Sequence, residues 1–196
     1  MHEALLLDIG YVIIELNWPA VEAYEAATGR PSPGRDGFGP PEASPSADEY
    51  WDRVARARGM DGFLALFRGM AETVPDLLFD PAAVTLMDDA RAAGYPIGVL
   101  TNDAYSFIGR DFFTTRPEFA DLDAFVDASE LGVRKPAPAA YLAAAEALGT
   151  PPDRIVFLDD TPECVDGARA VGMTAIHVDP YDRTPAFALT RALLAL

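Results

Sequence analysis

Short runs of apolar residues alternate along this chain with longer segments that have helical periodicity. Each run is brief, mostly rich in Leu, Ile and Val, and typical of a strand that is buried on both faces of a parallel sheet. The runs lie at residues 4–7, 97–100, 124–126, 155–158 and 174–178. Strands that alternate with helices in this order predict an α/β fold with a doubly wound parallel sheet.

Start and stop signals bound the helices between these strands. Asp80 and Pro81 form an N-cap and a first helical residue, and Gly94 ends the segment that follows. The next two helices are predicted from Pro138 to Gly149 and from Pro162 to Gly172 by the same kind of signal.

Residues 15–79 interrupt the alternation, because they contain no convincing strand pattern. Helical patterns cover residues 17–28 and 61–73, and a capping box, Ser46-x-x-Glu49, precedes a third. We therefore expect a core domain of residues 1–14 and 80–196, with a helical insertion at 15–79 after the first strand. Within it, residues 31–45 are rich in Pro and Gly and predict a loop, either a surface loop or a mobile element of the insertion.

Composition and charge limit the partners. The 196 residues are 50% hydrophobic, which is enough for a well-buried core, and the formal net charge is −16. So acidic a surface repels nucleic acid and anionic membranes, and neither is expected as a partner. No apolar run approaches the roughly 20 residues of a membrane span. Cys164 is the single cysteine, and MHEALLLDIG is typical of a strand rather than a signal peptide, so we expect a cytoplasmic protein.

Polar residues that can carry chemistry follow several of the predicted strands. Asp8 comes after the first strand, Thr101 after the second and Asp159-Asp160 at the end of the fourth, while Lys135 follows the third. Open α/β sheets bind ligands in the crevice beyond the carboxyl ends of their strands. Carboxylates without a histidine cluster favour a hard cation, Mg²⁺ rather than Zn²⁺. Lys135 is also the only lysine in a chain whose other basic side chains are arginines.

This set of side chains suits transfer of a phosphoryl group. A carboxylate beside Mg²⁺ and an ammonium stays ionised, so Asp8 can act as a nucleophile. The Thr101 hydroxyl and Asn102 can hold phosphate oxygens, and Lys135 can neutralise their charge. Tyr11, just after Asp8, is a candidate for lining the substrate pocket.

The motifs that carry these residues resemble those of the haloacid dehalogenase superfamily, in its phosphatase branch. The family's patterns hhhDxG, hhhTN, GxRKP and a terminal DD match residues 5–10, 99–102, 132–136 and 159–160 in the family's order. The resemblance covers essentially the whole chain, and the insertion at 15–79 matches the helical cap that closes over the site in this family.

The resemblance implies a role for each matching residue. Asp8 is the nucleophile that forms an aspartyl-phosphate, and Thr101 with Asn102 binds phosphate. Lys135 stabilises the nucleophile and the phosphoryl group. The Asp8 carboxylate, the Gly10 carbonyl and the Asp160 carboxylate bind Mg²⁺, and Asp159 assists directly or through water.

Gly10 departs from the family pattern. Phosphatases of the family usually carry an aspartate there, two residues after the nucleophile, and its general acid–base role is worth roughly 10²–10⁴-fold in rate. Three interpretations are open. The enzyme acts on a phosphate with a good leaving group, another group supplies the proton, or the protein has lost catalysis. The segment FLDDTPECVDGARAVGM resembles a branch with Asp-x-Gly that includes sugar-1-phosphate phosphatases, and this favours the first two.

We therefore expect an Mg²⁺-dependent phosphatase of a small phosphorylated metabolite. One alternative is a metal-independent 2-haloacid dehalogenase, since a halide leaves without a proton, although the retained Asp159-Asp160 pair favours metal. The other is a non-catalytic binding or regulatory module on a degenerate scaffold. No motif encodes the substrate or the oligomeric state.

Overall fold

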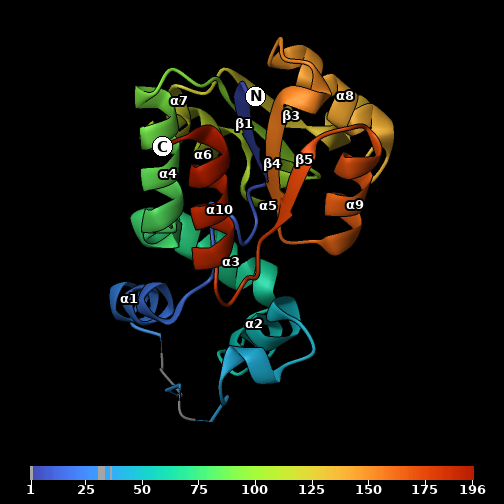
Figure 1. The fold of residues 1–196 in the computed structure, drawn as a ribbon. Helices are drawn as coiled ribbons and strands as arrows, with labels where there is room; N and C mark the ends of the chain where they lie inside the picture. The colour runs from blue at the N-terminus through green and yellow to red at the C-terminus, as the bar shows by residue number, and fades with distance from the viewer. Residues whose placement is uncertain (1, 31–33, 36) are drawn as a thin grey trace. The chain divides into compact units, whose positions relative to one another are not determined.

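The computed structural model describes residues 2–30, 34–35 and 37–196, and it divides the chain into two compact units. The first unit is Met1–Ile14 with Asp80–Leu196, and the second is Glu15–Phe79. Figure 1 shows the sheet of the first unit and the helices of the second.

The first unit is built on a five-stranded sheet in the order β3-β2-β1-β4-β5, in which every pairing is parallel. The strands are β1 (Ala4–Leu7), β2 (Ile97–Thr101), β3 (Ala124–Asp127), β4 (Ile155–Asp159) and β5 (Thr174–His177). This confirms the predicted doubly wound α/β fold, and each strand lies within two residues of its predicted bounds.

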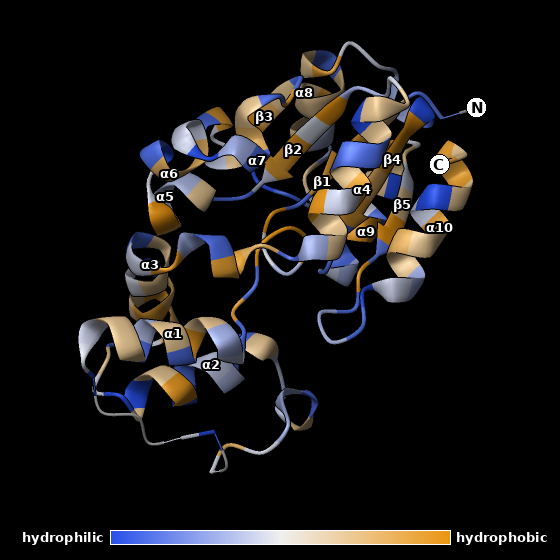
Figure 2. Cartoon of the chain, turned by 90° about the vertical axis from the view of Figure 1, so that its left-hand side faces the viewer, coloured by the Kyte–Doolittle hydropathy of each residue, from blue (hydrophilic) through white to orange (hydrophobic). Residues whose placement is uncertain are grey.

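Helices cover both faces of the sheet (Figure 1). On one face α8 (Pro138–Ala147) packs against β2 and β3, and α9 (Pro162–Ala170) packs against β4 and β5. On the other face α4 (Pro81–Ala92) packs on β2 and on α10 (Thr184–Leu194). Buried strand residues such as Leu6, Leu100 and Phe157 form a core with small residues of α8 and α9. Figure 2 shows these apolar strands between helices whose outer surfaces carry hydrophilic residues.

The predicted helix signals act as expected. The Asp80 carboxylate accepts hydrogen bonds from the N–H groups of Ala82 and Ala83 at the start of α4, at 2.7 and 3.0 Å. Gly94 lies just beyond the end of this helix with a φ of +84°, which an L side chain rarely adopts. Local chemistry therefore determines where α4 begins and ends.

Two parts of the first unit carry helices that the sequence patterns did not predict. The connection between β2 and β3 contains three short helices, α5 (Ala104–Ile108), α6 (Arg110–Thr115) and α7 (Pro117–Ala120), and the chain ends with α10. Phe113 and Phe119 anchor the short helices by packing against Phe125 of β3. Burial of these rings holds this segment, together with the Asp127 carboxylate, which accepts from the Tyr105 N–H at 2.9 Å.

The second unit consists of α1 (Trp18–Thr28), α2 (Ala47–Arg56) and α3 (Phe63–Thr73), with 3₁₀ turns at Pro41–Ala43 and Pro75–Leu78. Trp18 packs on Trp51 and donates a hydrogen bond to the Tyr50 hydroxyl at 2.9 Å. A buried Arg58–Glu25 ion pair, 2.5 Å long, lies beside them. Of the predicted loop at 31–45, residues 31–33 and 36 lie outside the described residues, and the turn at Pro41–Ala43 is the helical element within the rest.

Candidate active site

The candidate site lies at the carboxyl edge of the sheet. Asp8 follows β1 directly, and its N–H donates to the Leu158 carbonyl of β4 at 2.8 Å. Thr101 and Asp159 are the last residues of β2 and β4, the strands on either side of β1. Parallel pairing of the central strands therefore brings Asp8 beside Thr101 and Asp159.

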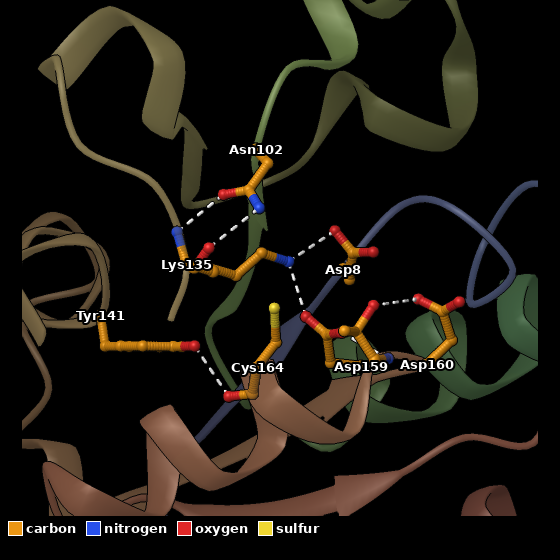
Figure 3. Close-up of polar contacts among 8 residues, drawn as sticks. Asp8, Asn102, Lys135, Tyr141, Asp159, Asp160 and Cys164 are labelled. Carbon is orange, nitrogen blue, oxygen red and sulfur yellow. Dashed lines mark hydrogen bonds and ion pairs between the residues drawn. The ribbon is translucent and has the colours of Figure 1, made fainter. Parts of the chain in front are cut away.

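Lys135 connects two of these carboxylates (Figure 3). Its Nζ donates to Asp8 Oδ1 at 2.8 Å and to Asp159 Oδ2 at 2.6 Å. Lys135 is only 6% exposed, so the ammonium exchanges nearly all of its water for these two partners. Burial by itself lowers the pKa of this lysine, but Asp8 and Asp159 outweigh it and hold the pKa above its usual value. The lysine is therefore a fixed positive charge at the predicted nucleophile.

Asp160 completes an acidic cluster with Asp8 and Asp159, in which three carboxyl groups lie near a single ammonium group, that of Lys135. One oxygen each from Asp8, Asp159 and Asp160 lie within 4.8 Å of one another. Burial, followed by repulsion from Asp8, raises the pKa of Asp160 to about 8, and the same causes raise that of Asp159 to about 6. A bound cation relieves this repulsion. Three oxygen donors fit Mg²⁺, which prefers carboxylate and water ligands.

The two aspartates of the pair differ in how their oxygens are used. Asp159 Oδ2 accepts from Lys135, and its Oδ1 accepts from the Thr161 N–H at 2.9 Å. The side-chain hydrogen bond that the Asp160 carboxylate accepts in the described residues is a weak one, from the Thr161 hydroxyl at 3.5 Å. Asp160 therefore has more lone pairs available for a metal ion than Asp159 has.

Gly10 leaves space near the predicted nucleophile. A Cβ atom placed on Gly10 meets only Asp8 Oδ2, at 4.0 Å, and the φ of Gly10 lies outside the left-handed region. Neither space nor backbone conformation requires glycine at this position. The missing aspartate is a chemical difference from the family pattern that the backbone does not impose.

Asn102 and Tyr11 are placed differently from the other predicted site residues. Both polar atoms of the Asn102 amide contact the backbone of Lys135 (Figure 3). Tyr11 has a φ of +54°, unusual for a residue other than glycine. Its N–H donates to the Ile14 carbonyl and its carbonyl accepts from Arg183 Nε, each at 2.7 Å.

Three residues that the sequence analysis did not single out support the site. Arg183, just before α10, binds the Tyr11 carbonyl and lies 3.6 Å from Asp80 Oδ2. His177 Nε2 contacts the Asp160 carbonyl at 2.9 Å, and the buried Tyr141 hydroxyl donates to the Cys164 carbonyl at 2.7 Å. Their partners are distant in sequence, and no local pattern signals such contacts. Only His177 has a weak signal, because it ends the strand that follows the Asp pair.

Cys164 lies close to the cluster but is not disposed to react. Its side chain is buried, and burial, with a smaller contribution from Asp159, raises the thiol pKa to about 12. The thiolate is the nucleophilic form of cysteine, so this residue is inert near neutral pH.

Comparison with known proteins assigns the family. The model of the haloacid dehalogenase-like hydrolases matches residues 11–172, and the chain belongs to that family. Phosphatase MT3486 of Mycobacterium tuberculosis is 36% identical over 104 residues, which cover 53% of this chain and 48% of that protein. The chain spans about half the length of the curated relatives that it matches.

Solved structures share the fold along the whole chain. A haloacid dehalogenase-type phosphatase from Thermococcus onnurineus superposes with a TM-score of 0.61 at 19% identity, covering 98% of this chain and 97% of that one. A family enzyme from Bacteroides thetaiotaomicron, an aspartate-to-alanine variant in complex with magnesium and inorganic phosphate, has a TM-score of 0.54 at 16% identity and covers 95% and 98%. In the part of this chain that the structure describes, no helix has the length and hydrophobicity of a membrane span.

Proposed function

We propose that this protein is an Mg²⁺-dependent phosphatase of a small phosphorylated metabolite, with Asp8 as the nucleophile. The observation that carries the proposal is the Lys135 ammonium 2.8 Å from Asp8, beside an Asp159-Asp160 pair whose oxygens meet those of Asp8 within 4.8 Å. This places the Asp8 carboxylate beside an ammonium that can also bind phosphate oxygens. Membership of a hydrolase family and the likeness to a mycobacterial phosphatase support the same reading.

In the first step, an Asp8 carboxylate oxygen attacks the phosphorus atom. The bond from phosphorus to the leaving-group oxygen breaks, its electron pair stays on that oxygen, and an aspartyl-phosphate forms. Lys135 offsets the charge on Asp8 and on the phosphoryl oxygens. When bound, Mg²⁺ would be held by Asp8, Asp160 and the Gly10 carbonyl, and it would supply positive charge for the phosphate oxygens.

In the second step, water attacks the aspartyl-phosphate, the bond between Asp8 and phosphorus breaks, and inorganic phosphate leaves. The attacking water loses a proton and the departed oxygen gains one, so that protons balance over the two steps. Gly10 offers no side chain to move either proton. We therefore propose substrates whose oxygen leaves readily, such as anomeric sugar phosphates, with the unit Glu15–Phe79 acting as the cap that selects among them.

A screen of phosphorylated metabolites, with Mg²⁺ and with a chelator, tests the proposal. We expect Mg²⁺-dependent release of phosphate, absent in Asp8→Asn because an amide does not attack phosphorus. Beryllium fluoride should bind at Asp8 in a crystal of the native protein. Turnover that persists in chelator with a 2-haloacid substrate would indicate a dehalogenase instead. No turnover of any phosphate ester, with Asp8→Asn and native protein alike, would indicate a binding module.

A further inference from the structure

The side-chain amide of Asn102 contacts the backbone of a single residue, Lys135 (Figure 3). Its Oδ1 accepts from the Lys135 N–H at 2.7 Å, and its Nδ2 donates to the Lys135 carbonyl at 3.2 Å. These two bonds run in opposite directions, as in a pair of strands. They restrain both the position and the orientation of the Lys135 backbone.

We infer that Asn102 is a positioning residue, which holds Lys135 so that its ammonium reaches Asp8 and Asp159 together. The inference rests on the proposed phosphatase function. It differs from the role that the family resemblance implies, in which Asn102 binds phosphate. In this arrangement Asn102 acts on the reaction through Lys135.

The backbone at Lys135 needs such support. Residues 132–137 belong to no helix or strand, and the backbone hydrogen bond that spans Lys135 in the described residues is that of a single turn, from the Ala137 N–H to the Arg134 carbonyl at 2.8 Å. Within the described part of the chain, the two bonds from Asn102 are the hydrogen bonds of the Lys135 main chain. A lysine stem is long and flexible, and its ammonium reaches two fixed carboxylates only if its base is fixed.

The neighbouring pair of residues provides a matched control. Asp103 follows Asn102, and its carboxylate forms a 2.7 Å ion pair with Arg134, the residue before Lys135. The Arg134 side chain is 57% exposed, and exposed pairs contribute little. Asp103→Asn therefore removes a link between the same two loops and leaves the Asn102 bonds intact.

The single lysine of the chain allows a test that needs no turnover. Lysine labelled with ¹³C and ¹⁵N gives one side-chain signal in metal-free protein, and acetic anhydride modifies one lysine side chain. We expect the native signal to be shifted from that of free lysine and its acetylation to be slow. Asn102→Ala should move the signal toward free lysine and raise the acetylation rate at least about tenfold, since a released side chain exchanges with solvent. Asp103→Asn should change neither.

A double-mutant cycle then separates positioning from direct phosphate binding. Asn102→Ala should lower kcat about 10²-fold in the native background, the effect of a small misplacement in an active site, and change KM less. In a Lys135→Ala background the same substitution should change kcat less than about threefold, because the group it positions is gone. Asn102→Asp, which keeps the acceptor for the Lys135 N–H, should lie between native protein and Asn102→Ala in both assays.

Each contrary result has a distinct meaning. An Asn102→Ala effect of equal size in both backgrounds would show that Asn102 contacts phosphate itself and would overturn the inference. An unchanged Lys135 signal and acetylation rate in Asn102→Ala, with thermal unfolding like that of native protein, would overturn it too. If native protein hydrolyses no phosphate ester, the proposed function fails, and the lysine signal still decides whether Asn102 holds Lys135.

Discussion

At the scale of single residues, the site depends on which basic side chain occupies position 135. Lys135 is bonded to two carboxylates while almost fully buried, whereas its neighbour Arg134 forms an exposed ion pair. Exchanging lysine and arginine should therefore change the activity at position 135 and leave it nearly unchanged at position 134. At Gly10, by contrast, an added Cβ meets only Asp8 Oδ2, at 4.0 Å.

Lys135→Arg should lower kcat by about 10²-fold or more. A guanidinium is larger and planar, and it does not place one donor between Asp8 and Asp159 at the 2.8 and 2.6 Å of the ammonium. Arg134→Lys is the matched control and should keep nearly native activity. Steady-state kinetics on one phosphate ester check both, and full activity in Lys135→Arg would mean that any buried cation suffices.

Gly10→Asp should flatten the dependence of rate on the leaving group. In native protein, kcat/KM should rise steeply from alkyl to aryl phosphates, since no acid neutralises the departing oxygen. The position has room for the start of a side chain, because an added Cβ meets only Asp8 Oδ2 at 4.0 Å. We expect alkyl phosphates to gain about 10²-fold, the lower end of general acid catalysis, and aryl phosphates to change little.

Gly10→Ala is the control for this change, because it adds the same Cβ without an acid and should leave the dependence steep. A flat dependence in native protein would instead show that another acid already protonates the leaving group.

At the scale of elements, Arg183 ties together three segments that are far apart in sequence. From the residue before α10 it reaches the Tyr11 carbonyl after β1 and the Asp80 carboxylate at the start of α4. Tyr11 has a left-handed backbone, which costs about 1–2 kcal/mol in a residue other than glycine. Hydrogen bonds to both of its backbone polar groups hold this turn beside the acidic cluster.

Arg183→Met should lower the free energy of unfolding by about 1–3 kcal/mol, because it leaves a carbonyl and a carboxylate without this partner. Asp80→Asn should cost less, since asparagine is as good an N-cap for α4 and only the ion pair is lost. Urea denaturation measures both. Arg191→Met on α10 is the control, because Arg191 pairs with the exposed Asp89 and should cost no more than about 0.5 kcal/mol.

At the scale of the whole molecule, negative charge predominates both over the chain and within the candidate site. The net charge is −16, and the core of the site places three carboxylates around one ammonium. Because Asp159 and Asp160 have raised pKa values, of about 6 and 8, the folded protein keeps protons that the unfolded chain releases near pH 4. The metal-free protein should therefore lose stability as pH rises from about 4 to 8.

Asp160→Asn should make the metal-free protein more stable at pH 8, by about 1 kcal/mol or more, the scale of one pKa unit. Added Mg²⁺ should raise the Tm of native protein, as a ligand of the folded state does, and should not raise that of Asp160→Asn. Asp166→Asn, at an exposed carboxylate of α9, is the control and should behave as native in both respects. Equal Mg²⁺ stabilisation in native protein and Asp160→Asn would remove Asp160 from the metal site.

Much of the architecture could be predicted because its signals are local. Apolar runs mark each strand, and Asp80, Pro81 and Gly94 mark the ends of α4 by their own backbone and side-chain chemistry. Parallel strands then place the residues after them at one edge of the sheet, which is why Asp8, Thr101 and the Asp159-Asp160 pair could be grouped from sequence. The short helices at residues 104–120 escaped prediction because buried aromatic rings hold them, without strong caps.

The sequence alone therefore determined the fold class, the strands and the candidate residues of the site. Tertiary structure decided the strand order and the partners of each side chain: Lys135 between Asp8 and Asp159, Asn102 on the Lys135 backbone, and Arg183 on Tyr11. These contacts join residues separated by long stretches of chain. Packing of the whole core sets their distances, and no periodicity or capping signal within a segment records them.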